Sequence, residues 1–236
     1  MEKTLLERTI AIFRGSCSNK GERLDRNNHF YNFAKKQIKG RYFFARKFVK
    51  NKKVLDIACG DGYGTSIIAQ IAKQVIGVDY DESTIRMNNS TYKKTNVEFR
   101  VGDGNNIKIK DKFDTVISFE TIEHLKEGQK FIHSLYNLLN KNGTLVLSTP
   151  DHKFKDLFFG GKILMKYHLK EYYQEEMAEL LKKVGFQEIQ IYYYHIAAKK
   201  FKYLSFIYFF LKRGFKVLPK TKKVVPINMI FVARKK

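Results

Sequence analysis

The sequence of 236 residues contains no tryptophan, three prolines and only two cysteines. The cysteines, Cys17 and Cys59, are too few for a disulfide framework, and Cys59 lies within a glycine-rich loop. A small secreted protein held together by disulfides is therefore excluded. This cysteine usage is typical of a reducing compartment, and we expect a cytoplasmic protein.

Long hydrophobic runs are also absent. Charged residues, among them Glu2, Lys3 and Arg8, interrupt the apolar residues near the start, so no signal peptide is expected. The longest apolar run near the C-terminus, Tyr203 to Leu211, has about half of the roughly 20 residues that a membrane-spanning helix needs. A transmembrane segment is not expected.

Acidic residues are scarce at both ends of the chain, and none follows Glu188. Residues 1–52 hold 14 Lys and Arg against 4 Asp and Glu, residues 53–188 hold 19 of each class, and residues 189–236 hold 12 and none. The net charge of +22 therefore comes from the two ends. Two explanations are open: a general enrichment in lysine, which the neutral middle weakens, or a cationic face for an anionic membrane surface, nucleic acid or a phosphorylated substrate.

The chain is organised around a strand, a glycine-rich loop and a helix. Residues 54–65 read VLDIACGDGYGT, in which an apolar strand with an acid is followed by glycine at every second position. An apolar-periodic helix is predicted over 65–72. Glycine lets the backbone approach a ligand closely, and a helix N-terminus supplies N–H groups that lack helical partners. The pattern predicts a nucleotide-binding turn.

One alternative for this turn is the dinucleotide fingerprint G-x-G-x-x-G. The third glycine comes one position early for it, and Asp56 would repel a pyrophosphate. The stretch VLDIACGDGYG resembles motif I of class I S-adenosylmethionine-dependent methyltransferases, an acid followed by three alternating glycines. The resemblance implies S-adenosyl-L-methionine as cofactor. It assigns Asp56, Gly60 and Gly62 to the methionine end, together with Ala58, which stands where many members have a further glycine.

Strands and helices alternate from Lys53 onward, as they do in a parallel α/β sheet. The predicted strands are Lys53–Ile57, Gln74–Val78, Val97–Val101, Phe113–Ser118, Thr144–Ser148, Gln187–His195 and Ile227–Ala233. Helices are predicted near 65–72, 83–94, 128–140 and 171–184. The resemblance implies an α/β fold with a seven-stranded, mostly parallel, Rossmann-like methyltransferase sheet that ends in an antiparallel hairpin.

Two domains are expected. Residues 1–52 are predicted to form an N-terminal helical cap, with helical runs near 5–13 and 29–49, and residues 53–236 the cofactor-binding domain. An aromatic and basic insert, residues 199–217, separates the last two strands. It resembles an interfacial helix that contacts an anionic membrane surface. Packing against the sheet, or against a partner subunit in a homodimer, is the alternative.

The second and third strands also end in acids. Asp79 can accept hydrogen bonds from both ribose hydroxyls. The next residue, Tyr80, is also expected to bind the cofactor. The resemblance implies that Asp103 accepts from the adenine amino group and that Gly104 donates its backbone N–H to a ring nitrogen. The alternatives are a helix cap, which fits Asp81 better, and a simple turn at Gly-Asp-Gly.

An arginine–tyrosine pair, Arg41-Tyr42, precedes motif I, as it does in many sugar and small-molecule methyltransferases. The resemblance implies that Arg41 contacts the cofactor. A solvated arginine beside a core tyrosine is the alternative.

The fourth predicted strand leads into SFETIEHL, residues 118–125. Ligands of open α/β sheets bind beyond the carboxyl ends of the strands, so this loop is expected to face the methyl group. The segment resembles the family's fourth motif, whose Glu-His pair occurs in ubiquinone-pathway O-methyltransferases and amino-sugar N-methyltransferases. It places Glu120 at the cofactor and makes His124 the candidate general base. A structural hydrogen bond from His124 to backbone is the alternative.

Metal binding is not predicted. Some relatives hold a divalent ion beside the Glu-His pair. No group of His, Cys and Asp residues in the sequence has a convincing metal-ligand spacing.

A second candidate base lies further along the chain. A loop is predicted from Lys153 to Tyr167, followed by YHLKEY, residues 167–172. This segment resembles one in glycan-modifying relatives and is predicted to form the acceptor wall, with His168 as a second candidate base. Glu171 is expected in the first turn of the next helix, where an acid complements the helix dipole.

The resemblance thus implies a methyltransferase that acts on an oxygen or nitrogen of a small molecule. A saccharide or a lipid-linked intermediate at the inner face of the membrane is the preferred acceptor. RNA methylation is supported by basicity alone, and no N-P-P-Y-type loop follows the fourth strand to receive a flipped base. A module that binds a nucleotide without chemistry stays open.

Overall fold

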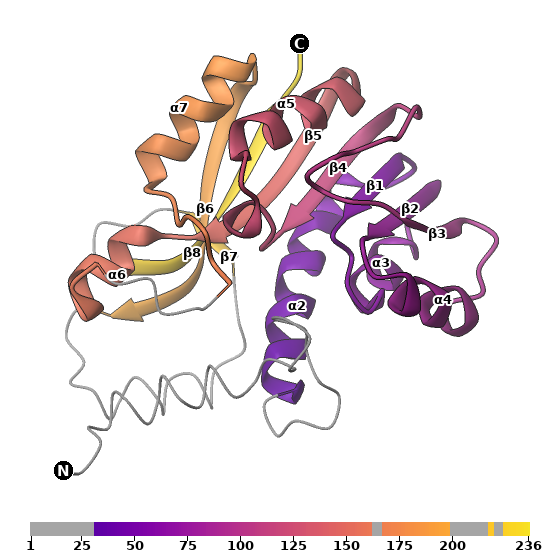
Figure 1. The fold of residues 1–236 in the computed structure, drawn as a ribbon, viewed down its shortest axis with the longest axis horizontal. Coiled ribbons are helices and arrows are strands. Elements are labelled where there is room, and N and C mark those ends of the chain that lie inside the picture. Colours follow the sequence, from indigo (N-terminus) through magenta and orange to yellow (C-terminus); the bar gives the residue numbers. More distant parts are fainter. Residues whose placement is uncertain (1–30, 162–166, 199–216, 220–223) are drawn as a thin grey trace.

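The computed structural model describes residues 31–161, 167–198, 217–219 and 224–236. Its centre is one eight-stranded sheet with the order β3-β2-β1-β4-β5-β8-β6-β7 (Figure 1). The strands are β1 (Lys53–Ile57), β2 (Gln74–Asp79), β3 (Val97–Val101), β4 (Phe113–Phe119), β5 (Leu139–Pro150), β6 (Gln187–Ala198), β7 (Val217–Pro219) and β8 (Val224–Arg234).

Helices cover both faces of this sheet. The α-helices of the described residues are α2 (Tyr31–Ala45), α3 (Tyr63–Ile68), α4 (Glu82–Thr91), α5 (Gly128–Leu138), α6 (His152–Phe159) and α7 (Gln174–Val184). Two 3-10 turns are η1 (Arg46–Phe48) and η2 (Ile122–His124). The helices α5 and α7 pack on one face, and α2 and α3 pack on the other.

The strand directions confirm the predicted fold class. The pairs among β1, β2, β3, β4 and β5 are parallel, and β8 is antiparallel to both β5 and β6. The sheet is therefore mostly parallel with an antiparallel ending. The eighth strand, β7, has three residues and pairs with the edge of β6. A strand this short leaves too few residues for an alternating pattern, so the sequence did not predict it.

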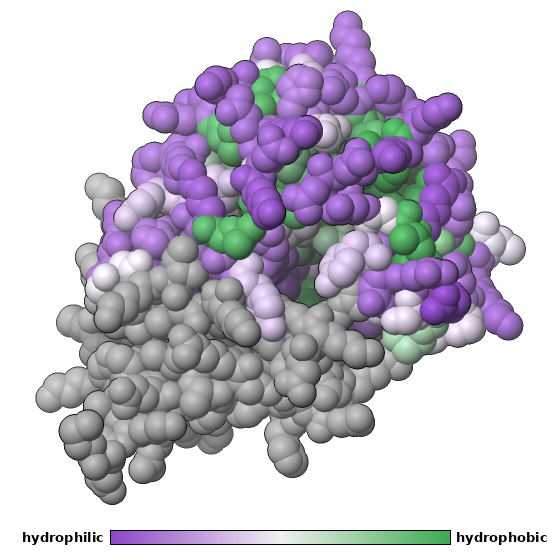
Figure 2. Space-filling model, in the orientation of Figure 1, coloured by the Kyte–Doolittle hydropathy of each residue, from purple (hydrophilic) through white to green (hydrophobic). Residues whose placement is uncertain are grey.

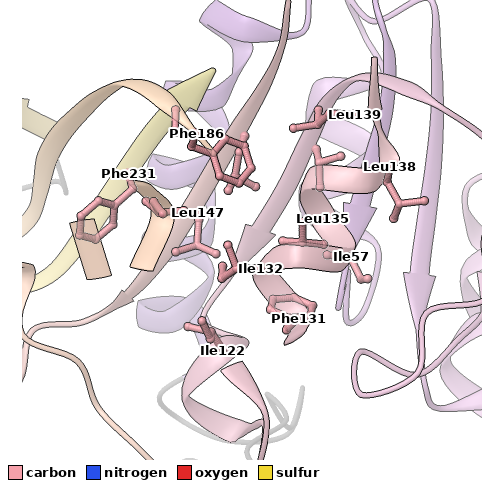
Figure 3. Close-up of a cluster of buried hydrophobic side chains, with 14 of the residues drawn as sticks. Ile57, Ile122, Phe131, Ile132, Leu135, Leu138, Leu139, Leu147, Phe186 and Phe231 are labelled. Atoms are coloured by element: carbon pink, nitrogen blue, oxygen red, sulfur yellow. The ribbon is translucent and has the colours of Figure 1, made fainter. Parts of the chain in front are cut away.

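Alternate residues of the strands face two different hydrophobic clusters, as the period of a strand requires. Ile57 and Leu147 pack with Phe131 and Leu135 of α5, whereas Val54 packs in the cluster that contains α2 and α3. Figure 3 shows the α5 side chains and the sheet side chains pointing toward one another. Burying each leucine contributes about 1.5–3 kcal/mol. Truncation of the fully buried Leu135 to alanine would cost about 2–5 kcal/mol.

The described part of the predicted N-terminal cap packs into the same core. Tyr42 and Phe44 of α2 share a hydrophobic cluster with Ile67 and Ile68 of α3. The helical run predicted near 29–49 is present as α2 and η1. The run near 5–13 lies outside the described residues, and the division at residue 52 stays a prediction.

Two local expectations are wrong. The loop predicted from Lys153 contains α6, which begins after Asp151, whose Oδ1 accepts a hydrogen bond from the backbone N–H of Lys153 at 3.0 Å. The helix predicted from residue 171 begins only at Gln174. Before it, Tyr172 pairs with Asp151 in an isolated bridge, and its carbonyl accepts from the backbone N–H of His152. The proposed cap at Asp81 is confirmed, since its carboxylate accepts from the backbone N–H of Thr84 at 2.6 Å.

The aromatic and basic insert lies outside the described residues, except for Val217, which begins β7. Among the helices that the structure describes, none is long and apolar enough to cross a membrane.

Candidate functional site

The predicted site residues lie at the carboxyl edge of the sheet. The four parallel strands β3, β2, β1 and β4 are adjacent, so the segments that follow them meet at one edge. Figure 2 shows a hollow near the middle of one face, with hydrophobic surface inside it, where Figure 1 draws the end of β4.

Glycine is required in the loop after β1 for a different physical reason at each position. Gly60 has φ +55°, and a Cβ added there would meet nothing within 4 Å. The position that a side chain would occupy is therefore open space. A Cβ on Gly64 would lie 2.0 Å from the ring of Tyr42, so this glycine makes room for α2. Ala58 has φ 58°, a left-handed conformation that glycine adopts without strain. This explains why a glycine suits position 58. Gly60 is the position at which a ligand could approach the backbone.

Asp56 joins three elements within the core. Its carboxylate is fully buried and accepts hydrogen bonds from Tyr42 Oη at 2.9 and 3.0 Å and from Thr65 Oγ1 at 2.6 Å. Burial raises the pKa of Asp56 to about 7, and the charge of Asp79 adds to the rise, although both hydroxyl bonds lower it. Asp56 thus holds β1, α2 and α3 together. Its predicted contact with the cofactor's methionine end stays a prediction.

Asp79 connects the loops after β1 and β2. Its Oδ2 accepts from the backbone N–H of Gly60 at 3.0 Å, and its Oδ1 accepts from that of Asp81 at 3.1 Å. Each carboxylate oxygen has two lone pairs, so it can accept more than one hydrogen bond. Tyr80 is 63% exposed beside it. The open space at Gly60 lies next to this carboxylate, and the ribose contacts of Asp79 and Tyr80 stay predictions.

Asp103 and Gly104 form a tight turn after β3. Asp103 Oδ1 accepts from the backbone N–H of Asn105 at 2.8 Å, and Asp103 pairs with Asn106 in an isolated bridge. A Cβ on Gly104 would lie 3.5 Å from Leu125, so this turn packs beside the segment that follows β4. The adenine contacts of both residues stay predictions.

Arg41 and Glu120, which the sequence assigns separately to the cofactor, contact one another. Arg41 Nη1 lies 3.4 Å from Glu120 Oε1, and the arginine is buried. Glu120 also accepts hydrogen bonds from Ser148 Oγ at 2.6 Å and from the side-chain amide of Asn228. Its backbone has φ 50°, a strained conformation for glutamate. The pair links α2 to the ends of β4, β5 and β8.

Glu123 is a site residue that sequence reasoning missed. It is fully buried, and its Oε2 accepts from Thr149 Oγ1 at 3.1 Å, while Oε1 has no hydrogen-bond partner among the described residues. Burial, followed by the charge of Glu120, raises the pKa of Glu123 well above its ordinary range. A buried carboxyl of this kind takes up a proton or a cation readily. Its place before His124 in a Glu-His pair was the available signal.

The two candidate bases lie together. The rings of His124 and His168 have centroids 4.8 Å apart at an interplanar angle of 80°. His124 Nδ1 lies 3.1 Å from the carbonyl oxygen of Tyr167, and His168 Nδ1 lies 2.6 Å from Glu171 Oε1. Carbonyl and carboxylate oxygens only accept, so Nδ1 carries the proton in both rings. Nε2 is then the nitrogen with the lone pair in each neutral ring.

Glu123, His124 and His168 each offer one ligand atom, and these atoms lie within 4.8 Å of one another, so the group could hold a metal ion. Imidazole and carboxylate are ligands of divalent ions. The expectation of no metal considered spacing along the sequence alone, which gave no sign that His168 approaches the other two residues. That expectation stays a prediction.

The dipole role expected for Glu171 is wrong. Glu171 precedes α7 by three residues, and its side chain is fully buried against His168. Lys155 Nζ lies 3.8 Å from Oε1, and His152 Nδ1 lies 3.9 Å from Oε2. Glu171 therefore belongs to the site. Only the folded chain brings these α6 residues to it.

The sequence matches known proteins over much of its length. Residues 48–204 match the model of a family described as a methyltransferase domain. A probable S-adenosylmethionine-dependent methyltransferase of Mycolicibacterium smegmatis is 34% identical over 139 residues, which cover 58% of this chain and 52% of the relative. A ubiquinone biosynthesis O-methyltransferase of Pelagibacter ubique is 29% identical over 126 residues, which cover 51% of this chain and 52% of the relative. The chain spans about half the length of these curated relatives.

Solved structures share the fold. A methyltransferase of Thermotoga maritima, described as a possible histamine N-methyltransferase, has a TM-score of 0.67 at 18% identity, covering 88% of this chain and 93% of that one. An N-methyltransferase of Bradyrhizobium japonicum, solved with S-adenosylhomocysteine, has a TM-score of 0.58 at 15% identity, covering 98% and 96%. At these identities the likeness concerns the fold alone.

Proposed function

The chain belongs to the methyltransferase-domain family, and from this premise we propose that it transfers the methyl group of S-adenosyl-L-methionine to an oxygen or nitrogen of a small molecule. In this proposal residues 53–236 bind the cofactor and residues 1–52 form the cap. The match to a family model over residues 48–204 supports the cofactor class.

The cofactor would lie across the carboxyl ends of β1, β2 and β3. Asp79 would accept from the ribose hydroxyls, with Tyr80 beside it. Gly60 would let the backbone approach the ligand, and Asp103 with Gly104 would meet the adenine. Asp56, Ala58 and Gly62 would act by shaping the loop, since Asp56 is fully buried. When bound, the cofactor supplies a methyl group on a positively charged sulfur.

The pairing of His124 with His168 is the observation that supports the reaction. An acceptor that took the methyl group would have to lose the proton of its O–H or N–H group. Two imidazoles with lone pairs on Nε2, beside the buried Glu123, can accept that proton. The protein otherwise aligns the acceptor and excludes water. The chemistry favours a hydroxyl or amine acceptor, since either carries a proton to give up.

A saccharide or lipid-linked acceptor is our preferred class. The segment that carries His168 also exposes apolar surface, with Tyr167 39% exposed, Leu169 54% exposed and Tyr173 40% exposed. Aromatic and aliphatic side chains of this kind pack on sugar rings and lipid chains. The similarity to a ubiquinone biosynthesis O-methyltransferase agrees with transfer to an oxygen. We place the protein in the cytoplasm, with residues 199–217 against an anionic membrane surface.

Radioactive methyl transfer into fractionated cell extract tests this function. We expect label from S-adenosylmethionine in a small-molecule or lipid fraction, and its loss in a His124→Ala/His168→Ala variant. Label in the RNA fraction alone would favour RNA methylation instead. Cofactor binding by wild type without transfer to any fraction would favour the non-catalytic module.

Liposome flotation tests the membrane part separately. We expect anionic vesicles to carry the wild-type protein upward, and to carry less of a variant with Phe206, Phe209 and Phe210 replaced by serine. Equal recovery of both proteins would contradict the membrane proposal and leave the methyltransferase proposal intact.

A further inference from the structure

A buried carboxyl group lies behind His168. Oε1 of Glu171 is 2.6 Å from Nδ1 of His168, and the two side chains are 0% and 8% exposed. A carboxylate only accepts hydrogen bonds, so the shared proton sits on Nδ1. A bond of this length to a carboxylate oxygen is of the strong, charge-assisted kind.

We propose that Glu171 is a positioning residue, which holds His168 in the tautomer with hydrogen on Nδ1 and so directs the Nε2 lone pair of that ring. The consequence for catalysis rests on the proposed function. The tautomer itself rests on geometry alone.

The surroundings of Glu171 favour this role over a purely structural one. Lys155 Nζ lies 3.8 Å from Oε1, an ion-pair distance, and His152 Nδ1 lies 3.9 Å from Oε2; both distances are longer than a hydrogen bond. Oε2 has no hydrogen-bond partner among the described residues. A fully buried carboxylate with one oxygen outside any hydrogen bond is costly to stability, even with an ion pair nearby. Such costs persist mainly where function needs them.

The backbone around Glu171 is tied to neighbouring segments on both sides. The N–H of Leu169 donates to the carbonyl of Glu123 at 2.8 Å, and the N–H of His152 donates to the carbonyl of Tyr172 at 3.0 Å. The backbone on the two sides of Glu171 is therefore tied to η2 and to α6. A positioning residue needs a rigid support of this kind.

One short segment consequently orients both histidines. The carbonyl of Tyr167 engages Nδ1 of His124, and the carboxylate of Glu171 engages Nδ1 of His168. Both rings are held by the same nitrogen, and their edge-to-face contact at 4.8 Å keeps them adjacent. Residues 167–171 thus set the tautomers of the pair.

Nitrogen-15 NMR of the histidine side chains tests the tautomer directly, without any acceptor. In wild type at neutral pH we expect His168 with hydrogen on Nδ1. His133 is an internal reference for the opposite tautomer, because its Nδ1 lies 3.1 Å from the donor amide of Asn137. A wild-type His168 with hydrogen on Nε2 would overturn the proposal, even if every variant failed to fold.

Two variants of Glu171 extend the test to activity. Glu171→Leu removes the acceptor, so we expect His168 to lose the Nδ1–H tautomer and kcat to fall about 10-fold or more, with KM and cofactor affinity nearly unchanged. Glu171→Gln keeps an acceptor oxygen, so we expect it to restore the tautomer and most of kcat. Glu175→Gln, a change at an exposed glutamate of α7, is the matched control and should match wild type.

The failures of the two proposals are distinguishable. An inactive wild type whose His168 carries hydrogen on Nδ1 would contradict the methyltransferase proposal and support the tautomer. An active wild type whose Glu171→Leu variant keeps both its tautomer and its kcat would overturn the positioning role alone.

Discussion

The cofactor half and the acceptor half of the carboxyl edge are built in opposite ways. In the cofactor half, Asp79 binds the backbone of Gly60, which lies in the neighbouring loop. In the acceptor half, Glu123 and His168 come from segments that are far apart in the sequence, and both are held by buried polar groups. In the proposed function, the cofactor contact of Asp79 and Gly60 depends on motifs that can be read along the chain. The chemistry depends on long-range packing.

The largest effect that would separate the halves comes from the histidines. Removing a general base lowers the rate by about 100- to 10,000-fold. We expect a His124→Ala/His168→Ala variant to lose kcat by about this factor and to keep its affinity for S-adenosylhomocysteine. Steady-state rates and calorimetry on the same preparation check this. A matching loss of cofactor affinity would break the comparison, because the histidines would then belong to the cofactor half.

The next largest expected effect is the dependence of folding stability on pH. Asp56, with a pKa raised to about 7 by burial, and Glu123, whose pKa burial also raises, hold protons in the folded state that the unfolded chain releases near pH 4. Folding therefore takes up protons at these two groups. Their contribution to stability is complete below the pKa of the unfolded chain and is lost as pH rises through the pKa of the folded protein. We expect a loss of about 1 kcal/mol per pH unit for each group between roughly pH 5 and pH 7. Urea unfolding at several pH values measures it.

Replacing each carboxyl group by its isosteric amide identifies which of the two causes the pH dependence of stability. Glu123→Gln and Asp56→Asn should each flatten part of the pH dependence. A dependence unchanged in both variants would contradict the assignment to these two buried groups.

The two glycines Gly64 and Gly60 give a smaller, local contrast. Gly64→Ala drives a Cβ into the ring of Tyr42, so we expect about 1–3 kcal/mol of destabilisation by urea unfolding. Gly60→Ala meets open space and only the strain of positive φ, so we expect about 1 kcal/mol in stability together with weaker cofactor binding. Loss of cofactor binding at Gly64 without loss of stability would reverse these two roles.

The smallest expected effect concerns the link between the cap and the loop. Tyr42→Phe removes the hydroxyl that donates to Asp56, and we expect about 1 kcal/mol of destabilisation by urea unfolding. Because phenylalanine keeps the aromatic ring at position 42, the packing of that ring against Gly64 should be unchanged. Stability equal to wild type would show that this bond does not hold the cap.

The sequence was most informative where one motif contained the whole interaction. The sheet and the placement of Asp79 beside the loop of Gly60 follow from alternating strands and a glycine pattern. The hydrogen bond from Tyr42 to Asp56 joins residues 14 apart in the sequence, and no local pattern reveals how the helix that carries Tyr42 packs. Glu171 was read as a helix-dipole acid because nothing in YHLKEY shows that the carboxyl turns back onto His168. Contacts set by tertiary packing were out of reach.

Titration calorimetry with S-adenosylhomocysteine tests the central claim most directly, namely that the carboxyl edge holds one adenosyl cofactor beside the histidine pair. We predict one molecule bound per chain, affinity lowered about 10-fold or more in Asp79→Ala, and affinity within about 2-fold of wild type in His124→Ala. Binding of NAD in its place, or an Asp79→Ala variant that binds as wild type does, would contradict it.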